Sequence, residues 1–224
     1  MPKRAESKQM IPGKKCVILL GGDIVPTPRL VSQCRNAVVL AADSGVRHAP
    51  ALGLAVDSWI GDFDSTTPAL ARKFESLPRK IFPRDKDKTD GELAIDEAIS
   101  RGCNSFVMVG AFGGPRTDHA LLHGLQALEI RKRGYAIVLT SGNEEAWPVL
   151  PGTERFDIEA GAIFSLIGFG ALENVTITAA KWPLEDRFVT AGSSLTLSNV
   201  ATGPVTVTIG KGEGLFIAGS SPSE

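Results

Sequence analysis

The chain has 224 residues, and its 24 lysines and arginines nearly balance its 25 aspartates and glutamates. With 43% hydrophobic and 22% charged residues it has the composition of a folded globular protein. It lacks the basic surplus that nucleic-acid binders use against the phosphate backbone, and no apolar stretch approaches the ~20 residues that span a bilayer. We therefore expect neither a nucleic acid nor a membrane among its partners.

The start of the chain and the cysteines suggest a cellular compartment. Residues 1–15 are basic, and the apolar run that follows them is too short for a secretory signal. Cys16, Cys34 and Cys103 are widely spaced and form no C-x-x-C pair, which argues against a zinc site or a disulfide framework. We expect a flexible tail over residues 1–15, three buried thiols in a reducing environment, and a cytoplasmic protein.

Short apolar segments alternate with helical patterns through the first two thirds of the chain. Strands are predicted at residues 16–20, 37–42, 58–60, 80–82, 106–109 and 136–140. Most of these runs are continuous, which is typical of strands buried on both faces of a parallel sheet. Helices are predicted at residues 68–77, 89–101 and 118–133, the second of them opened by a Thr89–Glu92 capping box. This alternation predicts an α/β domain with a Rossmann-like parallel sheet over residues 16–146.

The pattern changes in the last third of the chain. Short segments rich in Val, Ile, Thr and Phe predict strands at residues 156–159, 162–169, 175–178, 194–197, 205–209 and 215–218. Residues 210–214 are predicted to form a hairpin loop. Because Trp147-Pro148 and Pro151-Gly152 interrupt the periodicity, we place the domain boundary at residue 147. Residues 147–224 are therefore expected to form a smaller all-β domain, an antiparallel sandwich or a partial barrel.

Acidic residues follow several of the predicted parallel strands. Asp62 and Asp64 flank Phe63 after one strand, while Asp43 and Asp90 follow two others. The carboxyl ends of parallel strands meet at one edge of a sheet, where ligands bind, so these carboxylates are expected to converge. Such an all-oxygen set suits Mg²⁺, which commonly bridges carboxylates to substrate phosphates.

A second group of residues favours phosphate binding at the same edge. The chain has neither a P-loop nor a G-x-G-x-x-G motif, but Gly113-Gly114 precedes a predicted helix and leaves backbone N–H groups for phosphate. Arg116 lies beside them, and with the cations of the 84–88 segment it is expected to supply positive charge to a polyphosphate. A carboxylate metal site beside a basic glycine loop is the pairing that MgATP chemistry needs. His119 is a candidate ligand contact, whereas His123 is expected to be a residue that packs its helix against the rest of the protein.

The segments so far considered resemble, in order, the signature segments of the thiamine pyrophosphokinase family. They are Asp43-Ser44-Gly45, Gly61-Asp62-Phe63-Asp64-Ser65, Lys86-Asp87-Lys88-Thr89-Asp90 and Gly113-Gly114-Pro115-Arg116-Thr117-Asp118-His119. The later Lys181-Trp182-Pro183-Leu184 and Ser198-Asn199 are similar, more loosely, to its thiamine-binding domain. Ser44 stands where the family more often has glycine.

The resemblance implies a homodimeric enzyme that transfers the pyrophosphoryl group of ATP to the hydroxyl of thiamine, giving thiamine diphosphate and AMP. It implies an active site shared between two subunits, with Mg²⁺ as cofactor and ATP as co-substrate. Metal binding and catalysis would fall to Asp43, Asp62, Asp64 and Asp90. ATP binding would fall to Asp43, Lys86, Asp87, Thr89, Gly113, Gly114 and Arg116, and thiamine binding to Asp118, His119, Trp182, Ser198 and Asn199.

Two other functions fit the same residues. A pyrophosphokinase for another small alcohol, such as a pterin, would keep the acidic crevice and differ in the β domain. A non-catalytic nucleotide-binding module would keep the phosphate loops without needing both Asp62 and Asp64.

Overall fold

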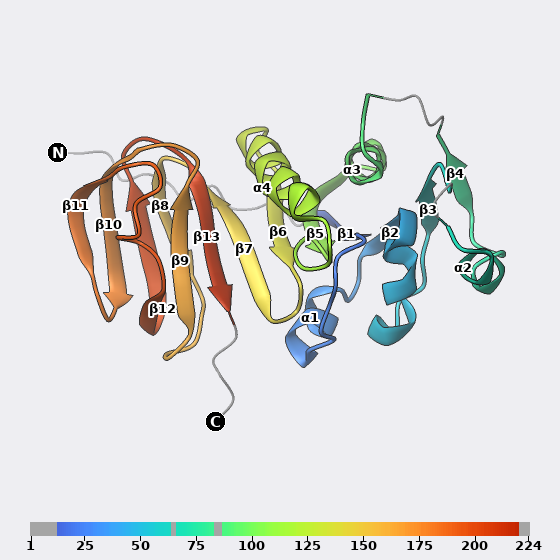
Figure 1. The fold of residues 1–224 in the computed structure, drawn as a ribbon, viewed down its shortest axis with the longest axis horizontal. Helices are drawn as coiled ribbons and strands as arrows, with labels where there is room; N and C mark the ends of the chain where they lie inside the picture. Colours follow the sequence, from blue (N-terminus) through green and yellow to red (C-terminus); the bar gives the residue numbers. More distant parts are fainter. Residues whose placement is uncertain (1–12, 64–65, 83–86, 220–224) are drawn as a thin grey trace.

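One mixed sheet runs through the computed structural model, which describes residues 13–63, 66–82 and 87–219. Within these residues the sheet has 13 strands, 12 of which follow the order β11-β10-β12-β9-β13-β7-β6-β5-β1-β2-β3-β4, with β8 beside β12. Helices lie against the part that contains β1 to β6, and the other end consists of strands alone (Figure 1). The fold is therefore mixed α/β.

The parallel part of the sheet matches the predicted strands closely. It consists of β1 (Lys14–Leu19), β2 (Val38–Ala42), β3 (Ser58–Gly61), β4 (Arg79–Ile81), β5 (Cys103–Val109) and β6 (Ala136–Thr140). All five pairings along β6-β5-β1-β2-β3-β4 are parallel. The direction in which the chain adds strands reverses between β1 and β5, and such a switch point opens a crevice at the carboxyl ends of the strands.

Helices cover both faces of this parallel part (Figure 1). On one face lie α3 (Asp90–Ser100) and α4 (Thr117–Lys132), and on the other lie α1 (Pro28–Gln33) and the 3₁₀ helices η1 (Asp43–His48) and η2 (Pro50–Leu52). A further short helix, α2 (Pro68–Lys73), precedes β4. The predicted capping box opens α3, because the Thr89 hydroxyl accepts from the Glu92 amide while the Glu92 carboxylate accepts from the Thr89 amide.

Burial on both faces explains why the strand sequences are continuously apolar. In β1, Cys16 and Ile18 pack against α3 and α4, whereas Val17 and Leu19 pack against α1 and η1. Successive side chains of a strand point to opposite faces, so a strand with helices on both sides needs apolar residues at every position.

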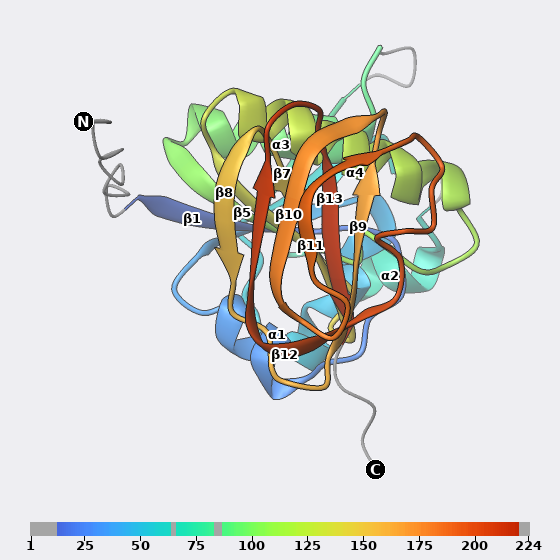
Figure 2. The same ribbon diagram turned by 90° about the vertical axis from the view of Figure 1, so that its left-hand side faces the viewer.

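The C-terminal strands form two layers (Figure 2). They are β7 (Glu144–Val149), β8 (Gly152–Phe156), β9 (Ile163–Gly168), β10 (Leu172–Ala180), β11 (Leu184–Val189), β12 (Asn199–Ile209) and β13 (Gly214–Gly219). The start of β12 pairs with β9, and the rest of it pairs with β8 and β10 in the other layer. Phe156 of β8 stacks on Phe216 of β13 across the buried space, with ring centroids 3.9 Å apart.

Three features of this region differ from the sequence prediction. Residues 194–197 form turns rather than a strand, and the hydroxyl of buried Thr196 donates to the Leu166 carbonyl. The missed β11 carries the charged stretch Glu185-Asp186-Arg187 on an edge strand whose residues are mostly exposed. Residues 210–214 are not a hairpin loop, since β12 and β13 are separated by β9.

The region around residue 147 is also continuous where the sequence suggested a break. Trp147 and Pro148 lie inside β7, which pairs with β13 along its whole length. On the other side β7 pairs with β6 only at Glu145 and Ala146. Pro148 therefore faces no β6 partner that would need its missing N–H, which is why a proline is tolerated there. Pro151-Gly152 does not separate the strands widely either. The next strand, β8, begins at Gly152 and ends at Phe156, whereas the sequence predicted a strand at residues 156–159.

All three cysteines are buried, as predicted, and this sets their reactivity. Burial raises the pKa of the Cys34 thiol to about 11 and raises the pKa values of Cys16 and Cys103 as well. Because the thiolate is the reactive form, we expect a chromogenic disulfide reagent at pH 7.5 to label no thiol in the native protein. The same reagent should label three thiols after denaturation, and rapid labelling of the native chain would contradict this burial.

Among the described residues, the structure contains no helix that is long and apolar enough to cross a membrane.

Candidate active site

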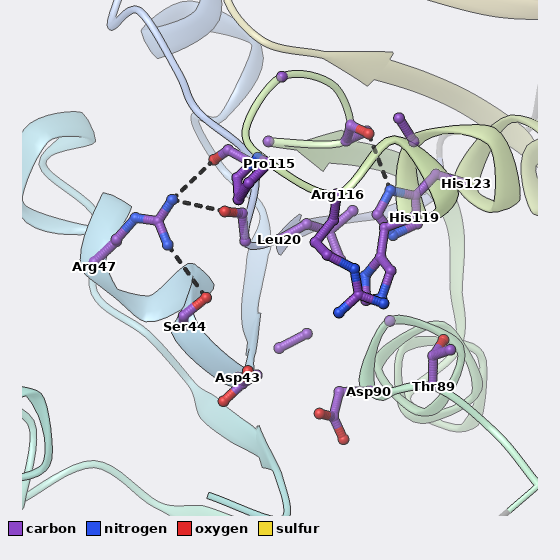
Figure 3. A pocket seen from close by; sticks show the side chains of 18 residues that line it. Leu20, Asp43, Ser44, Arg47, Thr89, Asp90, Pro115, Arg116, His119 and His123 are labelled. Carbon is purple, nitrogen blue, oxygen red and sulfur yellow. Dashed lines mark hydrogen bonds between the residues drawn. The ribbon is translucent and has the colours of Figure 1, made fainter. Parts of the chain in front are cut away.

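A cavity of about 330 Å³ lies at the carboxyl edge of the parallel strands (Figure 3). The loops that follow β1, β2 and β5 form its walls, together with the first turns of α3 and α4. Six of the residues predicted for the site line it: Asp43, Thr89, Asp90, Gly113, Arg116 and His119. The convergence expected from the strand order is therefore found for these residues.

The carboxylates of Asp43 and Asp90 lie on the same side of this cavity (Figure 3). Gly61, at the end of β3, lies between them: a Cβ atom built on it would be 3.6 Å from the Asp90 carboxyl carbon and 3.7 Å from the Asp43 Cα. Asp62 follows directly in the chain. Asp43 and Asp62 thus follow the ends of neighbouring strands, as the sequence indicated, whereas Asp90 is the first residue of α3. Asp62 does not line the cavity.

The fourth predicted carboxylate, Asp64, lies outside the described residues, as do Ser65 and Lys86. In the described part of the chain, no three acidic, histidine or cysteine side chains are arranged as a ready metal site. The donors at this edge are carboxylate oxygens, the type that Mg²⁺ prefers, and substrate phosphates and water commonly supply the remaining ligands of that ion. The residues present therefore fit Mg²⁺ together with a phosphate ligand.

Glycines allow the loops after β1 and β5 to approach each other at the cavity. A Cβ atom on Gly22 would come within 2.4 Å of the Gly110 and Phe112 carbonyl oxygens, so only glycine fits between the loops after β1 and β5. Gly113 and Gly114 adopt left-handed conformations with φ of 74° and 75° beside Asp23. Small residues here expose backbone to the cavity, as a phosphate-binding loop requires.

Two residues of η1, Arg47 and His48, hold the glycine turn after β1, and sequence reasoning missed them. Arg47 lines the cavity and donates to the Gly21 carbonyl at 2.6 Å and to the Ser44 hydroxyl at 3.2 Å. The His48 Nε2 lies 2.8 Å from the Gly22 carbonyl oxygen. In the sequence, the only indication of this role is that both residues lie shortly after Asp43. Ser44, unlike Asp43, does not need a positive φ, so the serine is accommodated without strain.

Arg116 and His119 reach into the cavity from the start of α4 (Figure 3). The Arg116 guanidinium binds both oxygens of Asp118, at 2.9 and 2.7 Å, and this pairing lowers the pKa of the Asp118 carboxyl. Asp118 itself does not line the cavity, so its contact with the site is through Arg116. His123, predicted to be a helix-packing residue, is buried, but it also lines the cavity.

Three other predicted nucleotide contacts have different surroundings. The Thr89 hydroxyl is used in the capping box of α3, although the residue lines the cavity. Asp87 is exposed and does not line it. Gly114 lies next to Gly22 at the rim, where a Cβ atom on it would be 3.5 Å from the Gly22 Cα.

The predicted thiamine contacts of the C-terminal region lie far from this cavity within one chain. Trp182, Ser198 and Asn199 belong to the β10, β11 and β12 end of the sheet, opposite β2, β3 and β4 (Figure 1). Asn199 is 3% exposed, and its amide bonds the Trp182 carbonyl at 2.7 Å and the Trp182 N–H at 3.1 Å. Asn199 thus holds the turn that presents Trp182, whose side chain is 54% exposed.

The buried histidines at the site make stability depend on pH. Burial lowers the pKa values of His48 and His123, because a buried imidazolium loses its hydration. Below about pH 6.5 the unfolded chain therefore binds protons that the folded chain does not, and stability falls by at most about 1.4 kcal/mol per histidine per pH unit.

We expect the melting temperature to fall between pH 7.5 and pH 5.5, as measured by scanning calorimetry, and to fall less steeply in His123→Gln. A melting temperature that is constant or rises over this range would contradict the assigned burial of these imidazoles.

Taken together, a parallel sheet with a switch-point cavity, two carboxylates on one side of it and glycine loops define an α/β protein with a candidate site for a phosphorylated ligand. Comparison with known proteins identifies the family. Residues 30–139 match the model of the thiamin pyrophosphokinase catalytic domain, and residues 154–213 match the model of its vitamin B1 binding domain. The chain belongs to the thiamine pyrophosphokinase family, whose members are ATP-dependent pyrophosphotransferases.

Individual relatives agree with this assignment. The chain is 31% identical to the thiamine pyrophosphokinase of Bacillus subtilis over 145 residues, which cover 62% of this chain and 66% of that protein. The crystal structure of a Bacillus subtilis thiamine pyrophosphokinase superposes with a TM-score of 0.79 and 25% identity, covering 92% of this chain and 99% of that one. The thiamin pyrophosphokinase of Candida albicans shares the fold at 13% identity, with a TM-score of 0.71 and coverage of 93% and 90%.

Proposed function

We propose that this protein transfers the pyrophosphoryl group of ATP to the hydroxyl of thiamine and releases thiamine diphosphate and AMP. The observation that carries the proposal is the cavity at the switch point, where Asp43, Asp90 and Arg116 meet within the segment that matches the catalytic domain. The proposal divides the chain into a Rossmann-like MgATP domain over residues 16–146 and a β-sandwich domain for thiamine over residues 147–224. It also makes the protein a cytoplasmic enzyme.

In this proposal Asp43, Asp62, Asp64 and Asp90 hold Mg²⁺ together with the phosphates of ATP. The ion, when bound, neutralises the charge that develops on the phosphate oxygens. Asn substitutions at these positions would keep the volume of each side chain but lose its charge.

The chain's own residues position the reactants. Backbone N–H groups of the glycine turns, Lys86 and the Arg116 guanidinium bind the phosphates, and Asp118 holds Arg116 in place. Asp87, Thr89, Gly113 and Gly114 complete the contacts to ATP. A carboxylate of the acidic group, Asp90 by preference, accepts the proton of the thiamine hydroxyl as the hydroxyl oxygen attacks the β-phosphorus. The bond from the β-phosphorus to the bridging α,β oxygen breaks, and AMP leaves with that oxygen. Most of the rate enhancement then comes from orientation and charge complementarity.

Thiamine binding needs a second subunit in this proposal. Trp182 and Ser198 lie at the opposite end of the sheet from Asp43, so the two halves of a site can meet only between chains. Exposed apolar side chains on α4 and in the β region, among them Leu121, Leu125 and Leu197, support an extended homodimer contact. His119, at the start of α4, would face thiamine from the catalytic side.

Trp182 is the proposed apolar wall for the cationic rings of thiamine. We expect Trp182→Ala to raise the KM for thiamine about 10-fold and leave the KM for ATP unchanged, because one ring contact is worth about 1–2 kcal/mol. Asn199→Ala should act in the same direction, since it releases the backbone of Trp182. Phe188→Ala, at a similarly exposed aromatic of β11, is the matched control. Equal rises in both KM values would place thiamine recognition elsewhere.

The function is tested by incubating the protein with MgATP and either thiamine or a pterin alcohol, and measuring AMP by chromatography. We expect AMP release with thiamine and none with the pterin. Release with the pterin alone would favour the alternative pyrophosphokinase, and no release with either would favour a nucleotide-binding module.

A further inference from the structure

We propose that Trp59 is a positioning residue for Asp43 and Asp62. Its indole N–H holds the backbone of Asp43, and its ring holds the turn that carries Asp62. Trp59 lies within β3, has 0% exposure and does not line the cavity. The inference rests on the proposed function only for the identity of the ligand, MgATP.

The first contact is a hydrogen bond to the backbone of Asp43. The Trp59 Nε1 donates to the Asp43 carbonyl oxygen at 2.7 Å. Asp43 begins η1 with a φ of 44°, a left-handed conformation that residues other than glycine seldom adopt. Such a conformation persists only where its surroundings fix it. The buried indole N–H, which itself needs an acceptor, supplies that constraint.

The second contact is through the ring. Phe63 packs edge-on against Trp59, with centroids 4.8 Å apart and planes at 88°. Phe63 is also left-handed, with a φ of 63°. The Arg79 guanidinium lies 5.0 Å from the Trp59 ring and 5.3 Å from the Phe63 ring, which fixes both rings from the β4 side. The turn that carries Asp62 is therefore anchored to the same side chain as Asp43.

One buried side chain thus links the loops that follow β2 and β3. Each loop carries an acidic residue proposed for the metal, and each has a strained backbone position in contact with Trp59. A tryptophan that only filled the core would also need an acceptor for its N–H, but that acceptor need not belong to a residue that lines the cavity. Loss of the N–H alone should therefore alter ligand binding, whereas loss of packing alone should alter stability.

Trp59→Phe separates these two roles, because it keeps an aromatic ring and removes the N–H. We expect the Mg²⁺ concentration for half-maximal rate to rise about 5- to 10-fold, with the KM for thiamine unchanged. Isothermal titration of MgATP should show a similar loss of affinity. Trp147→Phe is the matched control, since Trp147 packs against Phe156 and Phe216 in the C-terminal region and should change neither quantity. A folded Trp59→Phe protein with the wild-type Mg²⁺ requirement and MgATP affinity would overturn the proposal.

A measurement on the wild-type protein covers the case in which Trp59→Phe does not fold. The chain has three tryptophans, so ¹⁵N-labelled protein gives three indole N–H signals, and Trp147→Phe and Trp182→Phe identify that of Trp59 by elimination. We expect this signal to exchange slowly with solvent and to shift on saturation with MgATP. A signal that MgATP leaves in place would overturn the positioning role. Failure of the proposed function would appear separately, as a wild-type protein that binds MgATP without producing AMP from thiamine.

Discussion

Replacing Asp90 or Asp43 by asparagine is expected to lower kcat by about 10²- to 10³-fold. The two carboxylates lie on the same side of the cavity, and the amide would keep their size while removing the charge that a divalent cation and the transferring group require. The measurement is the initial rate of AMP formation at saturating thiamine and varied Mg²⁺. Part of the loss should be recovered at high Mg²⁺, because the weakened site is then filled by mass action.

The control for this pair is Asp96→Asn. Asp96 lies on the same helix as Asp90 but outside the cavity, where it pairs with Lys88 at 2.5 Å. It should leave kcat within about twofold, since exposed ion pairs contribute at most about 1 kcal/mol. Near-normal rates in both Asp90→Asn and Asp43→Asn at limiting Mg²⁺ would remove these residues from the catalytic group.

Gly45→Ala is expected to be the most destabilising single substitution near the site. A Cβ atom at this position would lie 2.2 Å from the Leu19 carbonyl oxygen and 2.8 Å from the Leu20 amide nitrogen. Both are backbone atoms at the end of β1, so the clash can be relieved only by moving η1 away from the sheet. We expect a loss of about 3 kcal/mol, or roughly 10 °C in melting temperature, with activity falling as η1 carries Asp43 away.

Gly170→Ala is the matched substitution for Gly45→Ala, because a Cβ atom there meets nothing within 4 Å and the residue does not have a left-handed φ. Its melting temperature should stay within about 2 °C of the wild type. If Gly45→Ala proved as stable as Gly170→Ala, the close approach of η1 to β1 would be wrong.

The α/β part of the fold was predictable because its strands are buried on both faces. In β1, Cys16 to Leu19 meet helices on alternate sides, so the whole run is apolar and its boundaries are clear. The short helices α1, η1 and η2 were missed because they span at most six residues each and show too little periodicity. The β region was harder, since tertiary contacts decide its strands: Pro148 is accepted in β7 only because the pairing of β7 with β6 stops at Ala146.

The site could be predicted to a similar degree. Acidic and glycine residues at strand ends identify the cavity, because the topology of a parallel sheet brings strand ends together. Arg47 and His48 were missed because their role is to hold the Gly21-Gly22 turn, a tertiary contact that no motif records. Asn199 was predicted as a direct substrate contact, but in the structure its amide is hydrogen-bonded to the Trp182 backbone. The sequence identified this residue without indicating what it binds.

The most direct test of the proposed reaction is the fate of the two terminal phosphates of ATP. The protein is incubated with thiamine, Mg²⁺ and ATP labelled with ³²P at either the β or the γ position, and the products are separated by chromatography. Attack at the β-phosphorus predicts that both labels enter thiamine diphosphate, in amounts equal to the AMP released. Transfer of the γ label alone, with ADP and thiamine monophosphate as products, would contradict pyrophosphoryl transfer.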